Sequence, residues 1–386
     1  MEEQIFDRSW AIWMANTVLT KFPLLRKSWS YDYGVICKGM ELVYELTGER
    51  KYYEYIKENI DYFIEHDGTI KMYDISKYSL DNINNGKIVL YLYNKTKEKK
   101  YALAAQTLMK QLENHPRTTE GGFWHKKRYP HQMWLDGLYM AEPFYAQYIS
   151  MFLEKKYDDV LLQFQLIDVH LKDKKTHLLY HGWDENRKSF WADPLTGTSK
   201  NFWGRAMGWY ACALVDTVDH IKTIPERKKL IKMIQDLTDA IIAVQSKEKG
   251  VWYQVLDKEE KKGNYPEASC SCMFVYFLIK AIRKGYIDRS RYKDAERAYY
   301  GIVREFIEVD ENGLLNLKQT VYVSGLGGNR FRDGSYEYYI SEPKQINNLL
   351  GIGFFLMASV EKEIYLKKKK YKMFWNTFLN ELLIGL

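Results

Sequence analysis

The sequence has few of the residues that interrupt helices or cross-link a chain. Only 8 prolines and 4 cysteines occur among 386 residues. Few prolines favour long helices, and lysine, glutamate and tyrosine fall in stretches with helical spacing. The cysteines show neither paired zinc spacing nor the density of a disulfide scaffold. They are Cys37, Cys212, Cys270 and Cys272. We therefore expect a helix-rich protein with reduced thiols in its core.

Apolar runs long enough to enter a membrane are also missing. No stretch approaches the roughly 20 apolar residues needed to cross a bilayer. Residues 1–6 lack the basic start and apolar run of a secretion signal. Hydrophobic residues still make up 46% of the chain and charged residues 28%, which is ordinary for a globular protein with a sizeable core. We expect a soluble, cytoplasmic protein.

The charge is mild and mixed along the chain. A net charge of +7 arises from 57 Lys and Arg against 50 Asp and Glu, and the two signs are interleaved. Nucleic-acid binding, which needs a basic face or arm, is therefore not expected. A mildly basic protein suits anionic small molecules such as uronic acids, although biased codon usage explains the same composition.

Hydrophobic spacing predicts a helical hairpin near the N-terminus. Ile36, Met40 and Val43 recur at three- or four-residue steps, and Gly48 then supplies a helix stop. After a short turn the same spacing continues over residues 52–63. A second helix, antiparallel to the first, follows from this pattern.

The hairpin pattern recurs along the chain. Tyrosine, threonine and lysine positions in residues 44–52 are matched in residues 93–101. Six hairpin starts share a polar or aromatic cluster followed by an apolar helix, and they lie near Trp29, Ser79, Gln132, Asn201, Pro266 and Ser341. Their irregular spacing argues against an open repeat array. We predict an all-α protein, an (α/α)6 barrel of six helical hairpins with the inner-helix N-termini at one mouth.

This barrel is predicted to fill one catalytic domain, residues 1–366. Residues 367–386 form a basic, amphipathic tail in which four consecutive lysines precede a run rich in apolar residues. We expect the tail to be helical and packed, and the alternative is that it binds a membrane surface or a partner.

Two aspartates stand at equivalent hairpin starts. Asp136 lies among Trp134, Leu135 and Tyr139, an apolar setting that would raise the pKa of its carboxyl group and suit it to general acid catalysis. Asp81 occupies the same point one hairpin earlier and would supply an ionised partner. The alternative for each is an N-cap that satisfies free backbone amides.

Aromatic and cationic side chains gather between residues 179 and 210. Trp203, Arg205 and Trp209 lie near one helix start. Indole faces stack on sugar rings, and a guanidinium group binds a carboxylate at two points. Arg205 is therefore either a uronate anchor or half of a structural ion pair.

Motifs for other chemistries are missing. His125 and His131 flank a basic turn at residues 126–128 but form no zinc-binding pattern. Neither a serine-nucleophile elbow nor a phosphate-binding loop occurs. The glycine-rich stretch 324–339 follows no suitable strand, so we interpret it as a rim loop. We expect no metal and no organic cofactor.

Four motifs together resemble glycoside hydrolase family 105, the unsaturated rhamnogalacturonyl hydrolases, from about residue 29 to residue 361. The motifs are Trp134-Leu135-Asp136-Gly137, His181-Gly182-Trp183-Asp184, Phe202-Trp203-Gly204-Arg205-Ala206 with Gly208-Trp209, and Arg332-Asp333-Gly334-Ser335-Tyr336-Glu337-Tyr338-Tyr339. The resemblance implies a six-hairpin barrel in which Asp136 is the catalytic acid and base and Asp81 the second carboxylate. It also implies a sugar site formed by His125, Trp134, His181, Trp203, Arg205 and Trp209.

The implied activity is removal of a terminal 4,5-unsaturated galacturonic acid from rhamnose-linked oligosaccharides of pectin breakdown. Asp136 would protonate carbon 4 of the vinyl ether and then deprotonate the attacking water, and the resulting hemiketal would open. Two alternatives stay open: an unsaturated glucuronyl hydrolase as in family 88, and a non-catalytic sugar-binding barrel. The chain departs from the family pattern at residues 347–351, where Asn-Asn-Leu-Leu-Gly replaces an Asn-Asp and a Lys-Gly pair.

Overall fold

The computed structural model describes residues 9–328 and 332–384, with side chains as far as residue 369. The predictions for residues 1–6 and for residues 329–331 of the rim loop fall outside the described residues. The described chain is mostly helical, and its only sheets are three short two-stranded ribbons. It confirms the all-α prediction.

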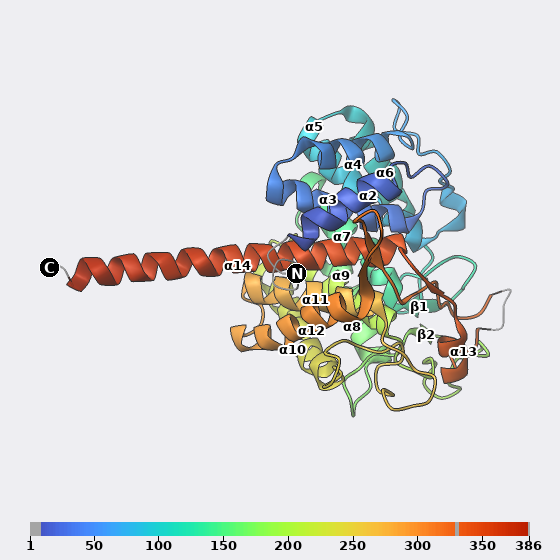
Figure 1. Ribbon diagram of the computed structural model, residues 1–386. Helices are drawn as coiled ribbons and strands as arrows, with labels where there is room; N and C mark the ends of the chain where they lie inside the picture. The colour runs from blue at the N-terminus through green and yellow to red at the C-terminus, as the bar shows by residue number, and fades with distance from the viewer. Residues whose placement is uncertain (1–8, 329–331, 385–386) are drawn as a thin grey trace.

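Six helices form a closed inner ring. They are α3 (Tyr31–Thr47), α5 (Gly86–Thr96), α7 (Leu135–Phe152), α9 (Gly204–Thr217), α11 (Ala268–Lys284) and α14 (Leu349–Ile384). Each packs against the next in this order, and α14 packs back against α3. The inner helices begin close after the predicted hairpin starts, so the predicted barrel is confirmed (Figure 1).

Six further helices cover this ring from outside. They are α2 (Trp10–Lys21), α4 (Arg50–Asp61), α6 (Lys99–Glu113), α8 (Asp158–Leu171), α10 (Ile224–Ala243) and α12 (Tyr292–Phe306). Five of them follow their inner partner in the chain, but α2 comes from the other end of the chain and packs on α14. Ser9 joins this pair: its hydroxyl accepts from the Ile12 amide at 3.1 Å and donates to Glu363 at 2.6 Å. The first and last helices of the described chain thus pack together where the ring closes.

Smaller elements gather in the connecting loops. The strands are β1 (Gln132–Trp134), β2 (Gly182–Asp184), β3 (Ile307–Val309), β4 (Leu315–Leu317), β5 (Thr320–Val321) and β6 (Lys344–Gln345), paired antiparallel as β1–β2, β3–β4 and β5–β6. The short helices are η1 (Ile75–Lys77), η2 (Leu80–Ile83), η3 (Arg289–Arg291) and α13 (Tyr336–Ser341). Figure 1 shows β1, β2 and α13 at one end of the barrel.

The first predicted hairpin is confirmed in detail. Helix α3 ends at Gly48, whose left-handed φ of 72° is easily adopted only without a side chain. Its amide bonds the Tyr44 carbonyl at 2.7 Å. Helix α4 begins two residues later, so the turn between the two helices is as short as the spacing predicts.

Helix α14 is much longer than its neighbours. It has 36 residues, or about 54 Å at 1.5 Å per residue, and Figure 1 shows its C-terminal part leaving the body of the protein. The helix continues through residues 367–384, and because this part extends away from the barrel, the expectation that the tail packs on it is wrong. The domain boundary at residue 366 stays a prediction. Among the described helices, none combines the length and apolar character required to span a bilayer.

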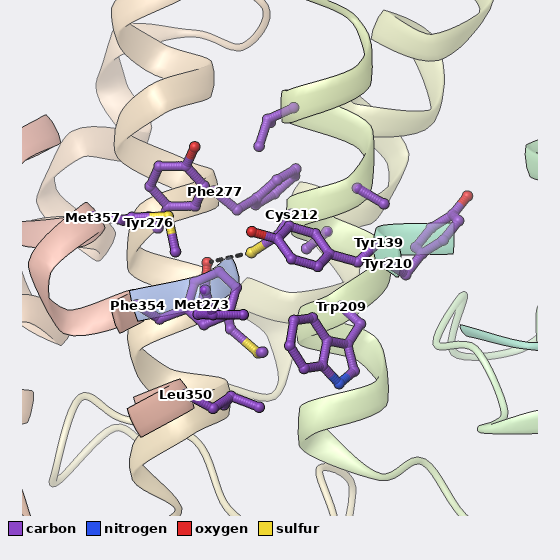
Figure 2. Close-up of a cluster of buried hydrophobic side chains, with 14 of the residues drawn as sticks. Tyr139, Trp209, Tyr210, Cys212, Met273, Tyr276, Phe277, Leu350, Phe354 and Met357 are labelled. Atoms are coloured by element: carbon purple, nitrogen blue, oxygen red, sulfur yellow. Dashed lines mark hydrogen bonds between the residues drawn. The ribbon is translucent and has the colours of Figure 1, made fainter. Parts of the chain in front are cut away.

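The axis of the barrel is filled by large side chains. Figure 2 shows Tyr139 from α7, Trp209 from α9 and Phe354 from α14 meeting there. The ring centroids lie 4.8 Å apart for Tyr139 and Trp209, and 5.5 Å apart for Trp209 and Phe354. The four cysteines are buried and free, as expected. The centre of the barrel is therefore a packed core and not a pore.

A proline inside α7 leaves one carbonyl without its helical partner. Pro143 has no amide proton, and the amide at this position would otherwise bond the carbonyl of Tyr139. Lys87 of α5 supplies a replacement donor, with its Nζ 3.4 Å from the Tyr139 carbonyl oxygen and 3.4 Å from the ring centroid. Burial lowers the pKa of Lys87 from 10.5 to about 7, against the opposing charge of Asp216.

We expect Lys87→Met to change how stability depends on pH. Folded Lys87 releases its proton near pH 7, whereas the unfolded chain holds it to about pH 10.5. The folded state binds fewer protons between these values, so this site's contribution to stability rises with pH. Relative to the variant, the wild type should gain about 2 kcal/mol of unfolding free energy between about pH 7 and about pH 9. Urea unfolding of both proteins measures this, since titrations common to both cancel. Parallel curves would contradict the lowered pKa.

Candidate functional site

The ribbon of β1 and β2 fixes the start of α7. Trp134 pairs with Gly182, and the Leu135 amide bonds the His181 carbonyl at 3.0 Å. As a result His181 Nε2 lies 3.2 Å from Asp136 Oδ2. Two motifs that are far apart in the sequence thus meet through backbone pairing.

Asp136 is the second residue of α7, and Trp134 occupies the N-cap position. The alternative of an N-cap aspartate is therefore wrong. The side chain keeps 15% of its surface exposed, while Oδ2 is buried and has no hydrogen-bond partner among the described residues. Such a carboxyl group can still bond a ligand.

His181 is held from behind by aromatic side chains. Its side chain is fully buried, and its Nδ1 lies 2.9 Å from the Tyr339 hydroxyl. The Trp203 ring lies 4.7 Å from His181 and stacks on Tyr339 at 5.9 Å. Trp203 Nε1 donates to Gln254 at 3.1 Å. His181 and Trp203 thus form a fixed wall beside Asp136.

Asp81 is the second residue of η2, after the N-cap position held by Ser79, and its carboxylate is bonded by Lys126 instead of capping a helix. His125 Nε2 lies 3.6 Å from Asp81 Oδ1. Burial alone would raise the pKa of Asp81, but the positive charge of Lys126, with a smaller contribution from Arg128, outweighs it and holds this pKa below its ordinary value. Asp81 is thus ionised at neutral pH.

His125 connects the two aspartate segments. Its amide bonds the Gln132 carbonyl at 2.7 Å, and its carbonyl accepts from the Leu80 amide at 3.1 Å. Its ring stacks on Trp134 with centroids 4.4 Å apart. Burial lowers the pKa of His125 to about 3, although the charge of Asp81 opposes this. His125 is therefore uncharged at neutral pH.

The guanidinium group of Arg205 donates hydrogen bonds to other groups of the protein. Its Nε donates to Ser269 at 2.8 Å, and its two terminal nitrogens donate to the carbonyls of Tyr322 and Val321. The nearest carboxylate oxygen of Glu267, a fully buried residue, lies 3.7 Å away. These contacts favour the structural ion pair over the uronate anchor, and they tie α9 to α11 and β5.

Two further side chains, which the sequence patterns did not single out as ligands, also belong to the site. The Tyr31 ring contacts Trp209 with centroids 6.1 Å apart. Burial raises the pKa of its hydroxyl, and the negative charges of Asp32, Asp81 and Asp136 raise it further, against the positive charge of Arg205. Lys126 is the partner of Asp81. Both stand at features visible in the sequence, the first hairpin start and the basic turn, but their direction depends on the fold.

The predicted residues therefore fall into two groups. One cluster contains Asp81, His125, Trp134, Asp136 and His181. Trp203 adjoins this cluster through His181, with ring centroids 4.7 Å apart. The second group is Arg205, which is bound by groups of the protein itself, and Trp209, which packs on Tyr139 in the barrel core. The Trp209 and Tyr31 rings meet at a steep angle, with centroids 6.1 Å apart.

The unusual asparagines at the start of α14 have structural contacts. Asn347 adopts a left-handed φ of 58° and accepts from the Leu317 amide at 2.9 Å. Asn348 accepts from the Leu350 amide at 3.1 Å. The pair thus shapes the loop into the helix. Within residues 9–328 and 332–384, no group of three or more His, Cys, Asp or Glu is arranged to hold a metal ion.

Comparisons with known proteins agree with this geometry. Residues 9–366 match the family model described as Glycosyl Hydrolase Family 88. A family 105 glycoside hydrolase from C. acetobutylicum ATCC 824 superposes with a TM-score of 0.91 at 47% identity, over 92% of this chain and 100% of that chain. The unsaturated rhamnogalacturonyl hydrolase YesR of Bacillus subtilis (strain 168) is 28% identical over 290 residues, 73% of this chain and 79% of that protein. The unsaturated glucuronyl hydrolase of Bacillus sp. GL1 shares the fold at 14% identity, with a TM-score of 0.67 over 94% and 96% of the two chains.

Proposed function

The chain belongs to Glycosyl Hydrolase Family 88 and, through its 47% identical relative, to family 105, and on this premise we propose that it releases a terminal 4,5-unsaturated galacturonic acid from rhamnose-linked oligosaccharides. The observation that supports this most is the pairing of two unlike carboxyl groups at neighbouring inner-helix starts. Asp136 has a buried oxygen without a partner among the described residues, and Asp81 is held as an anion by Lys126.

In the proposed reaction, Asp136 protonates carbon 4 of the unsaturated sugar. Positive charge then develops toward carbon 5 and the ring oxygen, where the ionised Asp81 stabilises it. Water adds at carbon 5 while Asp136 takes back a proton. The hemiketal then opens to a ketone at carbon 5, which leaves a hemiacetal at carbon 1, and collapse of this hemiacetal to the aldehyde releases the aglycone. His181 Nε2 lies 3.2 Å from Asp136 Oδ2, and Trp134, stacked on His125, forms part of the wall beside it. Every step uses side chains of this protein, with no net redox change.

We also propose that the protein works in the cytoplasm. The buried, free cysteines support a reducing compartment such as the cytoplasm. The proposed ligand is an unsaturated uronic-acid oligosaccharide.

Incubation with an unsaturated galacturonyl-rhamnose disaccharide tests the function directly. Hydration removes the double bond conjugated to the carboxylate, so we expect its ultraviolet absorbance to fall with time. An unsaturated glucuronyl disaccharide serves as the matched substrate. Faster turnover of the glucuronyl compound would favour the other substrate class, and binding of either sugar without loss of absorbance would indicate a non-catalytic barrel.

A further inference from the structure

A second cavity lies beside the candidate site. Its volume is about 490 Å³, within the range of roughly 300 to 1,000 Å³ usual for small-molecule sites. The lining residues are Met72, Asp74, Lys77, Ser79, Asn82, Lys126, Lys127 and Arg128. They come from the loop that ends in η1, from the start of η2 and from the basic turn.

The lining is strongly positive. Lys77, Lys127 and Arg128 face one carboxylate of the lining, that of Asp74, while the fourth cation, Lys126, is paired with Asp81. Asp74 Oδ1 already accepts from the Ser76 amide at 3.0 Å and from its hydroxyl at 2.7 Å. Lys77 reaches Asp74 only at 4.0 Å. Lys127 lies 3.5 Å from the Ser76 carbonyl and 5.6 Å from the centroid of the Tyr78 ring, which are weaker partners than a carboxylate in direct contact. The cavity is therefore suited to an anion.

The cavity and the candidate site share a wall. Ser79 and Asn82 line the cavity on either side of Asp81 in the chain, and Lys126 both lines the cavity and bonds the Asp81 carboxylate. A ligand that extends from Asp81 past Lys126 thus enters a positive environment. Met72, 59% exposed, adds an apolar surface at the rim for sugar C–H groups.

We propose that this cavity binds the carboxylate of a second uronic acid, further along the oligosaccharide whose terminal sugar reacts at Asp136. The inference rests on the proposed function, because it assigns the cavity to the same substrate. A rhamnose-linked disaccharide carries a single carboxylate, on the reacting sugar. A tetrasaccharide of alternating uronic acid and rhamnose carries a second one that can reach Lys77 and Lys127.

Another cavity offers a matched control. It is about 670 Å³ in volume, and its cations are accompanied by Asp173 and Asp193, so its charge is more balanced. Lys174 lines it, and Lys175 adjoins it in the chain. Replacing these two lysines removes the same charge from the protein as replacing Lys77 and Lys127, but away from the proposed subsite.

The experiment compares the Lys77→Gln/Lys127→Gln and Lys174→Gln/Lys175→Gln variants with the wild type. For each, kcat/KM is measured on the unsaturated disaccharide, the tetrasaccharide, and a tetrasaccharide whose saturated uronic acid is reduced to a neutral sugar. We expect the first variant to lower the tetrasaccharide-to-disaccharide ratio by about 3- to 10-fold, less at high salt. The control variant should keep the wild-type ratio, and the reduced tetrasaccharide should not distinguish the three proteins.

Binding to catalytically disabled protein separates this inference from the proposed function. Calorimetric titration of Asp136→Asn with the same tetrasaccharides, with and without the Lys77 and Lys127 substitutions, needs no turnover. Weaker binding that requires both the lysines and the second carboxylate supports the subsite, even if the wild type proves inactive. Equal affinity and equal kcat/KM ratios in all proteins would overturn it, whether or not the disaccharide is hydrolysed.

Discussion

In the Asp136→Asn variant we expect kcat on the unsaturated disaccharide to fall by about 10²- to 10⁴-fold, the usual contribution of a positioned general acid and base. An amide cannot donate the proton to carbon 4 or accept one from water. The fold should survive, because Asp136 Oδ2 has no hydrogen-bond partner among the described residues and asparagine has the same shape. Loss of ultraviolet absorbance measures the rate.

Asp32→Asn is a matched control for stability. Asp32 is the second residue of α3, as Asp136 is of α7, so both carboxylates lie near a helix N-terminus. Each substitution should change the unfolding free energy by no more than about 1 kcal/mol. Wild-type kcat in Asp136→Asn would contradict the catalytic role. A stability loss far above that of Asp32→Asn would give this aspartate a structural role instead.

For Arg205→Ala we expect a loss of stability of about 3 to 5 kcal/mol, the cost of leaving a buried charge without its partner. Glu267 has no exposed surface, and its carboxylate accepts from Ser269 and from the Val321 amide beside the guanidinium group of Arg205. Two backbone carbonyls on β5 and its continuation, at Val321 and Tyr322, also lose their donor. Urea unfolding measures the change.

Two further variants separate charge from geometry. Arg205→Lys keeps the positive charge but loses the planar donors, so its stability should fall between wild type and Arg205→Ala. Arg205→Met combined with Glu267→Gln removes both charges and should recover part of the loss. If Arg205→Ala unfolded like the wild type while its KM for the disaccharide rose, Arg205 would be the uronate anchor after all.

Part of the candidate site could be predicted from residue types alone. The sequence marks Asp136 as a carboxyl group in an apolar setting at a helix start, with an N-cap as the alternative, and the equivalent position one hairpin earlier marks Asp81. Sequence patterns left Arg205 undecided, because its partner Glu267 lies 62 residues away in the chain. The sequence showed Lys126 only as part of a basic turn. Its pairing with Asp81 could not be predicted, because the direction of the side chain depends on the conformation of that loop.

The periodicity of apolar residues determined the helices, and glycine and polar clusters determined where they begin and end. Both are local properties, so the hairpins and the number of inner helices could be predicted without a structure. The packing of α2 on α14 could not, because that contact joins opposite ends of the chain. The tertiary structure also decided which polar groups pair at the mouth: distances such as 3.2 Å between His181 and Asp136 follow from strand pairing and burial. Contacts of this kind join segments that are far apart in the chain, so they depend on the whole fold and cannot be predicted from a local sequence pattern.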